Sequence, residues 1–301
     1  MKVAVMGAGA IGCYFGAMLA RAKHDVVLIG RPQHVDAVNQ HGLLLESRNF
    51  HGHIPMKATT EPSGVEGADV VLFCVKSPDT ESAGRTIAAF LKPDAAILCL
   101  QNGVDNAERL QAATGRTAIP TIVYVATEMA GAGHIKHNGR GDLIIGASPA
   151  SADIARQFID AAIPTAVSEN VISDLWAKLI TNCAYNAVSA IAQLPYGIML
   201  KVKGVPDVIE NAIDECLSVA KAAGVTIPAD IKQAIFALGE AAPNQYSSTA
   251  QDLARGKLTE IDYLNGYVVR KGAALGIATP TNLALHAMVK LREAHLQQPR
   301  S

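Results

Sequence analysis

The feature that most constrains the fold is a glycine-rich segment near the N-terminus, Gly7-Ala8-Gly9-Ala10-Ile11-Gly12. It directly follows the apolar run Val3–Met6 and opens a stretch with helical spacing, Ile11–Arg21. In such a strand–turn–helix unit the first glycine permits a tight turn, the second lets the backbone approach a pyrophosphate, and the third lets helix and strand pack closely. The helix N-terminus presents N–H groups and a positive dipole end to the phosphates. We therefore predict that all six residues of the segment bind a dinucleotide, with a purely structural turn as the alternative.

Short apolar runs alternate with helix-like stretches through the first half of the chain. Three further runs, Val26–Ile29, Val70–Val75 and Ala96–Leu100, are bounded by polar or turn-forming residues. Runs that are apolar throughout are typical of parallel strands buried on both faces. A helix is expected over Asp79–Leu91, with Ser77-Pro78 supplying its N-cap and first-turn proline. This alternation predicts an α/β domain with a Rossmann-type doubly wound sheet.

The second half of the chain has a different character. Residues 119–146 are rich in β-formers and glycine, and we expect them to extend the sheet. From Val171 onward nearly all of the sequence has helical spacing punctuated by prolines. A chain of 301 residues suits two domains. We predict a dinucleotide-binding domain over residues 1–168 and an all-α domain over residues 169–301.

The end of the second predicted strand indicates which dinucleotide binds. Sites for NAD place a carboxylate there to bind the ribose hydroxyls. Here Val26–Ile29 runs into Gly30-Arg31, and the nearby Asp25 precedes the strand at its other end. An arginine at the strand tip suits a 2′-phosphate in charge and geometry. The sequence therefore favours NADP(H), the alternative being that Arg31 is an ordinary surface residue.

Two other polar side chains follow predicted strands. Lys76 comes after the strand ending at Val75, and Asn102 follows the strand ending at Leu100. Ligands of open parallel sheets bind beyond the carboxyl ends of the strands, so both residues are expected at the cofactor edge. A solvent-exposed strand end and an Asn-Gly turn are the simpler explanations.

One predicted helix in the second half carries a polar stripe. Lys178, Asn182 and Asn186 recur every fourth residue, and the rest of Trp176–Asn186 is largely apolar. Asparagine disfavours helices, so two of them in this position suggest partners inside a cleft, with a plain exposed face as the alternative. Farther on, Thr259–Gly266 is predicted to be helical, with Glu260 near its start, where a carboxylate is electrostatically favourable.

These motifs together resemble the ketopantoate reductase family, the 2-dehydropantoate 2-reductases, along the whole chain. The matching features are the glycine segment, the strand-end arginine and lysine, and four further blocks. Those blocks are Gln101–Gly103 (QNG), Gly133–Gly139 (GHIKHNG), Trp176–Asn186 (WAKLITNCAYN) with Ser248, and Thr259–Gly266 (TEIDYLNG). The resemblance implies a fold like that of 6-phosphogluconate dehydrogenase, and NADPH-dependent reduction of 2-dehydropantoate to pantoate in pantothenate and coenzyme A biosynthesis.

The resemblance also implies roles for individual residues. Lys178 would be the general acid that protonates the substrate carbonyl, and Glu260 would hold this lysine and the substrate hydroxyl. Four residues would orient substrate, namely Asn102, Asn182, Asn186 and Ser248. The cofactor would be bound by Gly7, Ala8, Gly9, Ala10, Ile11, Gly12, Arg31, Lys76, Asn102 and Glu260.

Two positions depart from some members of the family. Gln245 and Tyr196 stand where those members have asparagine, and both are expected near the substrate. A related reductase of another 2-keto or 3-hydroxy acid is therefore one alternative. A non-catalytic NADP(H)-binding sensor is another, against which the presence of Lys178 and Glu260 argues.

Composition limits the remaining possibilities. The formal net charge of −1 gives no general attraction to nucleic acid or anionic membranes, so neither is expected as a partner. The family resemblance implies a small-molecule 2-keto acid as the substrate. No signal peptide or membrane-spanning run is recognised, which predicts a cytoplasmic protein. The five cysteines lie mostly in apolar runs as expected for buried thiols, and the histidines lack metal-ligand spacing, so no metal is predicted. A homodimer remains open.

Overall fold

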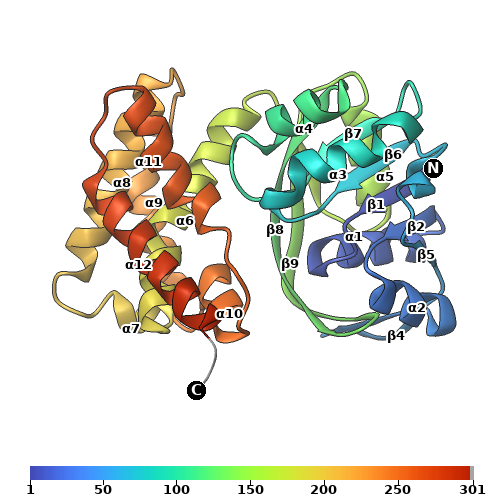
Figure 1. Cartoon of the computed structure of the whole chain (residues 1–301), viewed down its shortest axis with the longest axis horizontal. Coiled ribbons are helices and arrows are strands. Elements are labelled where there is room, and N and C mark those ends of the chain that lie inside the picture. The colour runs from blue at the N-terminus through green and yellow to red at the C-terminus, as the bar shows by residue number, and fades with distance from the viewer. Residues whose placement is uncertain (299–301) are drawn as a thin grey trace. The chain divides into compact units, whose positions relative to one another are not determined.

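The computed structural model describes residues 1–298 and divides into two compact units (Figure 1). The first unit comprises Met1–Gln101 and Asp105–Val171. The second comprises the short segment Asn102–Val104 and the chain from Ile172 onward. The chain thus passes into the second unit a few residues beyond the expected boundary after residue 168.

The first unit is built on one large sheet. Its parallel part has the order β5-β2-β1-β6-β7-β8, with β5 Lys57–Thr59, β2 Asp25–Ile29, β1 Lys2–Met6, β6 Val70–Phe73, β7 Ala96–Cys99 and β8 Ala118–Gly131. The sheet continues from β8 through β9 His134–Gly146 and β3 Leu43–Ser47 to β4 Phe50–Ile54, and β10 Thr165–Ser168 pairs with β9. In Figure 1, β8 and β9 are long curved strands that run antiparallel to each other. The predicted parallel sheet is confirmed, and residues 119–146 extend it as expected.

Helices cover both faces of the parallel strands. Alternate residues of β1 point to opposite sides, so that Val3 and Val5 join one core cluster and Ala4 joins another. The first cluster includes side chains of α1 Ala10–Arg21 and α5 Ser151–Asp160. The second includes side chains of α3 Thr80–Ile87 and α4 Asn106–Thr114. Burial on both faces explains why these strands are apolar throughout, and the doubly wound arrangement is confirmed.

The helix expected over Asp79–Leu91 is shorter and begins differently. The chain forms a 3₁₀ turn over Ser77–Asp79, then α3, then a second 3₁₀ turn over Ala88–Phe90. The predicted N-cap at Ser77 is therefore wrong. Its hydroxyl accepts a hydrogen bond of 3.1 Å from the side-chain amide of Asn106, a partner distant in sequence.

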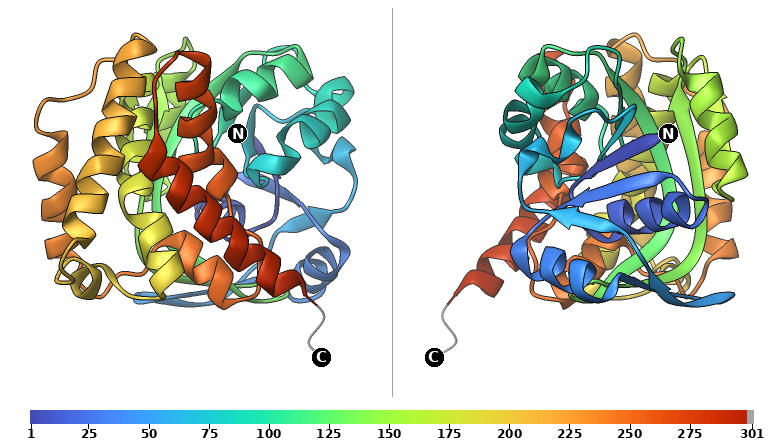
Figure 2. Two further views of the ribbon diagram at one scale, coloured as in Figure 1. Left: turned by 60° about the vertical axis from the view of Figure 1, so that its left-hand side comes forward. Right: turned by 90° about the vertical axis from the view of Figure 1, so that its right-hand side faces the viewer.

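Every element described from Val171 onward is helical, which confirms the all-α prediction. The helices are α6 Val171–Ala192, α7 Tyr196–Met199, α8 Val205–Ala222, α9 Ile231–Ala241, α10 Ser248–Ala254, α11 Asn265–Ala274 and α12 Pro280–Gln297. Small and branched residues of α6, α8, α10 and α12 share one core cluster. Figure 2 shows α12, in red, as a long helix running along this unit.

The predicted helix over Thr259–Gly266 is also corrected by the structure. Ile261–Tyr263 forms a 3₁₀ turn, and α11 begins only at Asn265. Between them Leu264 has φ −111° and ψ −105°, which interrupts helical geometry. Glu260 consequently precedes a short turn, not a long helix.

The five cysteines are free thiols, and four of them are buried. Burial raises the pKa of Cys13 and of Cys99 to about 12, so these thiols are poor nucleophiles. Among residues 1–298, no helix is long and apolar enough to cross a membrane. Within the same residues, no group of three or more histidine, cysteine or acidic side chains is arranged to hold a metal ion.

Candidate functional site

The glycine-rich segment connects β1 to α1 in a conformation that other side chains would disturb. Gly7 has a positive φ of 110°, and a Cβ there would lie 2.7 Å from the carbonyl carbon of Cys74. A Cβ at Gly12 would lie 2.3 Å from the carbonyl oxygen of Gly7. The amides of Gly7 and Ala8 donate to the carbonyl oxygen of Ile29 at 3.0 and 2.9 Å. Steric contact therefore requires glycine at both ends of the segment.

The middle of the segment is open. Gly9 precedes α1 with φ −87° and ψ −173°, and no described atom lies within 4 Å of the place that a Cβ would take. In the described chain no side chain caps this helix, and its first turn holds no acidic residue. The N–H groups of the first turn are thus available to an anion. This geometry fits the pyrophosphate of a dinucleotide.

Parallel pairing brings four strand ends to the same edge of the sheet. Met6 of β1 pairs with Ile29 of β2 and with Phe73 of β6, and Phe73 pairs with Cys99 of β7. The chain leaves this edge four times, through Gly7, Gly30-Arg31, Cys74–Lys76 and Leu100–Asn102. The structure therefore places the glycine segment, Arg31 and Lys76 at the end of the sheet where ligands of such folds bind.

Arg31 and Lys76 are both exposed at this edge. Arg31 immediately precedes α2 Pro32–His41, and Lys76 immediately precedes the 3₁₀ turn Ser77–Asp79. A cation next to the positive end of a helix favours a bound anion. The setting of Arg31 therefore suits a phosphate group.

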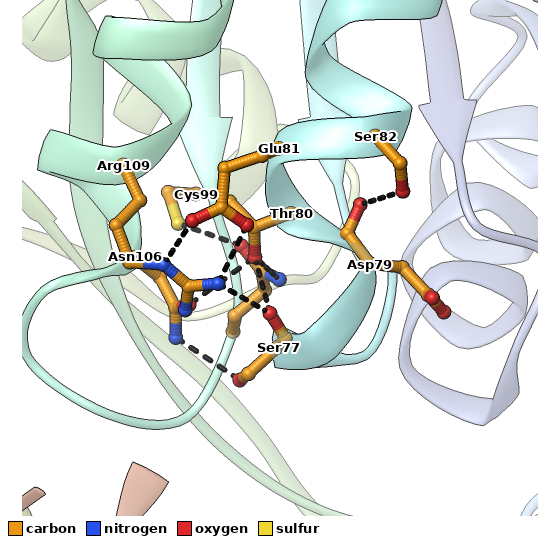
Figure 3. A network of polar contacts seen from close by, with 9 residues as sticks. Ser77, Asp79, Thr80, Glu81, Ser82, Cys99, Asn106 and Arg109 are labelled. Atoms are coloured by element: carbon orange, nitrogen blue, oxygen red, sulfur yellow. Dashed lines mark hydrogen bonds and ion pairs between the residues drawn. The ribbon is translucent and has the colours of Figure 1, made fainter.

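A buried polar network fixes the two loops that follow β6 and β7 (Figure 3). The side-chain amide nitrogen of Gln101 donates to the carbonyl oxygen of Val75 at 3.0 Å and to the hydroxyl of Thr80 at 2.8 Å. Asn106 accepts from the same hydroxyl at 3.2 Å and donates to the hydroxyl of Ser77 at 3.1 Å. Ser77 and Thr80 are fully buried, so the partners are needed to offset the cost of their burial.

Arg109 closes this network at its outer side. Its Nε and Nη2 atoms each donate to a carboxylate oxygen of Glu81 at 2.7 Å, and Nη2 also donates to the carbonyl oxygen of Ser77 at 3.0 Å. Hydrogen bonding from Arg109 lowers the pKa of Glu81. The bidentate pair joins α3 to α4 and holds the loop that carries Lys76.

Lys178 lies on α6 and is half-buried. Its Nζ donates to the side-chain oxygen of Asn102 at 3.0 Å. Asn102 belongs to the short segment that groups with the helical unit, although it directly follows Gln101 in the chain. The structure thus brings together two residues predicted from separate motifs.

The rest of the polar stripe lies on successive turns of α6. Asn182 is half-buried, whereas Asn186 is only 3% exposed. The carbonyl oxygen of Asn186 accepts from the hydroxyl of Ser247 at 3.2 Å. The same hydroxyl caps α10 by accepting from the amide of Ala250 at 3.0 Å. Ser248, the predicted substrate-binding residue, is the exposed first residue of α10.

The two departures from the family pattern lie together. The amide of Tyr196 donates to the carbonyl oxygen of Gln245 at 3.0 Å. The Tyr196 ring is 5% exposed and stacks on the ring of Tyr185 with centroids 4.6 Å apart. Burial raises the pKa of Tyr196 well above its usual value. Tyr196 is thus a core residue of the helical unit, while Gln245 is exposed.

Sequence reasoning did not find the residues that hold these loops. Ser77, Thr80, Asn106 and Arg109 meet only through the tertiary fold, because α3 and α4 are separated by β7 in the chain. The one local signal was that Thr80 and Asn106 are polar residues at buried helix starts.

Two sequence profiles match most of the chain. The profile described as ketopantoate reductase PanE/ApbA matches residues 3–150, and that of the C-terminal part of the same family matches residues 170–293. A Pyrococcus abyssi protein named 2-dehydropantoate 2-reductase is 33% identical over 300 residues, covering 98% of both chains.

Solved structures show the same relationship. A PanE/ApbA family ketopantoate reductase from Ralstonia eutropha is 53% identical with a TM-score of 0.96, over 99% of this chain and 100% of that one. D-mandelate dehydrogenase, solved with NADH and anilino(oxo)acetate, is 25% identical with a TM-score of 0.91, over 99% and 100% of the two chains.

The contrast between Gly9 and Gly12 gives a direct test of the glycine segment. In Gly9→Ala the added methyl group meets open space, so we expect an unchanged melting temperature but NADPH binding weakened by roughly tenfold or more, about 1.4 kcal/mol. Gly12→Ala, the matched control, should unfold at a lower temperature because its methyl group meets the Gly7 carbonyl. Thermal unfolding measures the melting temperature of each variant, and fluorescence titration measures its affinity for NADPH. Unweakened NADPH binding by Gly9→Ala would refute the proposed pyrophosphate site.

Proposed function

The chain belongs to the ketopantoate reductase family, and from that premise we propose that it reduces 2-dehydropantoate to pantoate with NADPH. This reaction is a step of pantothenate and coenzyme A biosynthesis. The observation that carries the proposal is the 3.0 Å hydrogen bond from Lys178 Nζ to Asn102, which holds an ammonium group at the start of a polar stripe on α6.

Lys178 is the proposed proton donor. When bound, NADPH supplies a hydride to the keto carbon, and negative charge then develops on the carbonyl oxygen. An ammonium group directed at that oxygen stabilises the transition state more than the ground state and transfers its proton to form the hydroxyl. Asn102 orients the ammonium through its side-chain oxygen, and Lys178 regains a proton from water.

The neighbouring polar residues are proposed to hold the substrate. Glu260 holds Lys178 and the substrate hydroxyl, while Asn102, Asn182, Asn186 and Ser248 orient the substrate. The burial of Asn186 supports this role, because a buried amide in an apolar helix needs hydrogen-bonding partners.

We propose the cofactor site on the same basis. The residues are Gly7, Ala8, Gly9, Ala10, Ile11, Gly12, Arg31, Lys76, Asn102 and Glu260. The open space over Gly9 and the exposed cation before α2 support the pyrophosphate and 2′-phosphate positions respectively. The proposed NADP-binding domain covers residues 1–168, and the proposed substrate domain covers 169–301, of which 299–301 lie outside the described residues.

The protein is also proposed to act in the cytoplasm. All five cysteines are free, as is typical of proteins in reducing compartments such as the cytoplasm.

A related activity has its own support. D-mandelate dehydrogenase has the same fold with 25% identity, so its name suggests an aryl 2-keto acid as a second candidate substrate. The exposed Gln245, one of the two departures from the family pattern, is consistent with a different acid. Comparing the turnover of ketopantoate with that of phenylglyoxylate distinguishes the two candidate substrates. NADPH binding without turnover of either acid would favour the non-catalytic sensor.

Substitution of Lys178 tests the proposed proton donor. We expect wild type to oxidise NADPH in the presence of ketopantoate, and Lys178→Ala to lower kcat by roughly 10²- to 10⁴-fold, since a general acid contributes about that much. Loss of NADPH absorbance measures the rate. Lys221→Ala, in the last turn of α8, is the matched control and should retain the wild-type rate. A Lys178→Ala variant as active as wild type would exclude this lysine as the proton donor.

Substitution of Arg31 tests the choice between NADPH and NADH. Arg31→Gln should lower kcat/KM for NADPH by roughly 10- to 100-fold and leave the value for NADH nearly unchanged, because a charge-assisted hydrogen bond contributes about 1.5–3 kcal/mol. Steady-state kinetics with each cofactor give kcat/KM for NADPH and for NADH, whose ratio measures the preference. Arg48→Gln, an exposed arginine elsewhere, serves as the control. Equal loss with NADH and NADPH would contradict the 2′-phosphate assignment.

A homodimer is proposed from the outer side of α12. Leu283, Met288 and Leu291 are 52%, 51% and 70% exposed there, and burying such side chains against a second copy is favourable. We expect sedimentation to give the mass of two chains and Leu291→Glu to give that of one. A single-chain mass for wild type at every concentration would contradict the dimer.

A further inference from the structure

The turn that carries Glu260 is held by residues far away in the sequence. Glu260 is half-buried and immediately precedes the 3₁₀ turn Ile261–Tyr263. Its neighbours Thr259 and Asp262 both bind side chains of α12. A carboxylate can act in catalysis only if the backbone that carries it is held in place. The contacts that hold the turn of Glu260 therefore affect the reaction.

Glu293 of α12 holds the start of the turn. One oxygen of its carboxylate accepts from the amide of Thr259 at 2.7 Å and from the Thr259 hydroxyl at 2.6 Å. The other oxygen pairs with Lys290 Nζ at 2.6 Å. Glu293 is only 3% exposed, and a buried carboxylate is costly unless it is paired and hydrogen-bonded. The burial of this charge is therefore tied to the position of Thr259.

Lys290 and His286 hold the other end of the turn. Lys290 Nζ donates to one oxygen of Asp262 at 2.9 Å, and His286 Nε2 lies 2.6 Å from the other. Burial tends to raise the pKa of Asp262, but hydrogen bonds from Lys290 and His286 lower it overall. Asp262 thus keeps its charge at neutral pH.

These contacts come from one face of α12. His286, Lys290 and Glu293 are spaced at i, i+4 and i+7, which places them on the same side of the helix. On that side Leu285 and Val289 also join the core cluster that contains the fully buried Ile261. The turn is therefore fixed by polar bonds at both ends and by a buried side chain between them.

We propose that this face of α12 positions Glu260 for the reaction, with Thr259, Asp262, His286, Lys290 and Glu293 forming a positioning clamp. The inference rests on the proposed function, because it gives Glu260 a role in handling Lys178 and substrate. None of the five clamp residues is a catalytic residue in this account. Each acts only through the backbone on either side of Glu260.

The alternative is that the clamp merely stabilises the fold. A second, half-buried polar cluster on the same helix allows a positioning role to be separated from a purely stabilising one. Glu215 of α8 accepts from the amides of Thr281 and Asn282 at 2.7 and 2.9 Å, at the opposite end of α12 from Glu293. Loss of the Glu215 contacts should lower stability without displacing Glu260.

The test uses Thr259→Val, which removes the hydroxyl but keeps the size of the side chain. We expect kcat for 2-keto acid reduction to fall by roughly 10- to 100-fold, as for a small misplacement of a reacting group. Thr259→Ser should restore most of the rate, and Glu215→Gln should lower the melting temperature without lowering kcat. In a Glu260→Gln background, Thr259→Val should cause no further loss of kcat, because the residue that it positions is already disabled.

Two outcomes would overturn the positioning role. One is an equal loss of kcat from Thr259→Val with and without Glu260→Gln, and the other is an unchanged kcat in Thr259→Val. If wild type reduces no 2-keto acid, the proposed function fails instead, and hydrogen exchange tests the clamp separately. The amide of Ile261 donates to the Thr259 hydroxyl at 3.2 Å, so its exchange should accelerate in Thr259→Val. Unchanged exchange at Ile261 would show that the clamp does not hold the turn.

Discussion

The hydrogen bond between Lys178 and Asn102 is the interaction on which the proposed chemistry of this protein depends. A lysine ammonium group is strongly hydrated and flexible, so it acts as a directed proton donor only when a partner fixes it. Asn102 is fit for that task because the preceding residue, Gln101, is anchored by hydrogen bonds to the loop after β6. The loop after β6 therefore fixes the residue that precedes Asn102, and helix α6 carries Lys178.

Buried polar groups are concentrated around the segments that carry candidate functional residues. Near the strand ends, Thr80 and Asn106 are buried and joined by hydrogen bonds beside the loop of Lys76. In the helical unit, the buried Glu293 holds the residue before Glu260. Such groups contribute little net stability, but they are costly when a partner is missing, which restricts each loop to one conformation. Rigid support for short functional loops is thus a common theme of both units.

The sequence predicted the elements whose signals are local. The glycine segment, the apolar strands and the polar stripe of α6 each have a spacing that specifies local structure, and the doubly wound sheet and the all-α second half were confirmed. The sequence-based predictions were wrong where contacts with residues distant in the chain determine the local structure. Ser77 is not an N-cap because it binds Asn106, and Thr259–Gly266 is not one helix because α12 binds both ends of its first turn. The assignments of Lys178, Glu260 and the three asparagines as site residues remain predictions.

A crystal structure of the protein with NADPH and an unreactive 2-keto acid analogue would test the central claim most directly. We expect that the carbonyl oxygen of the analogue accepts a hydrogen bond from Lys178 Nζ, that Asn102 still binds the same ammonium group, and that the pyrophosphate lies over Gly9. An analogue bound with its carbonyl oxygen away from Lys178 would contradict the account, even if NADPH occupied the glycine segment.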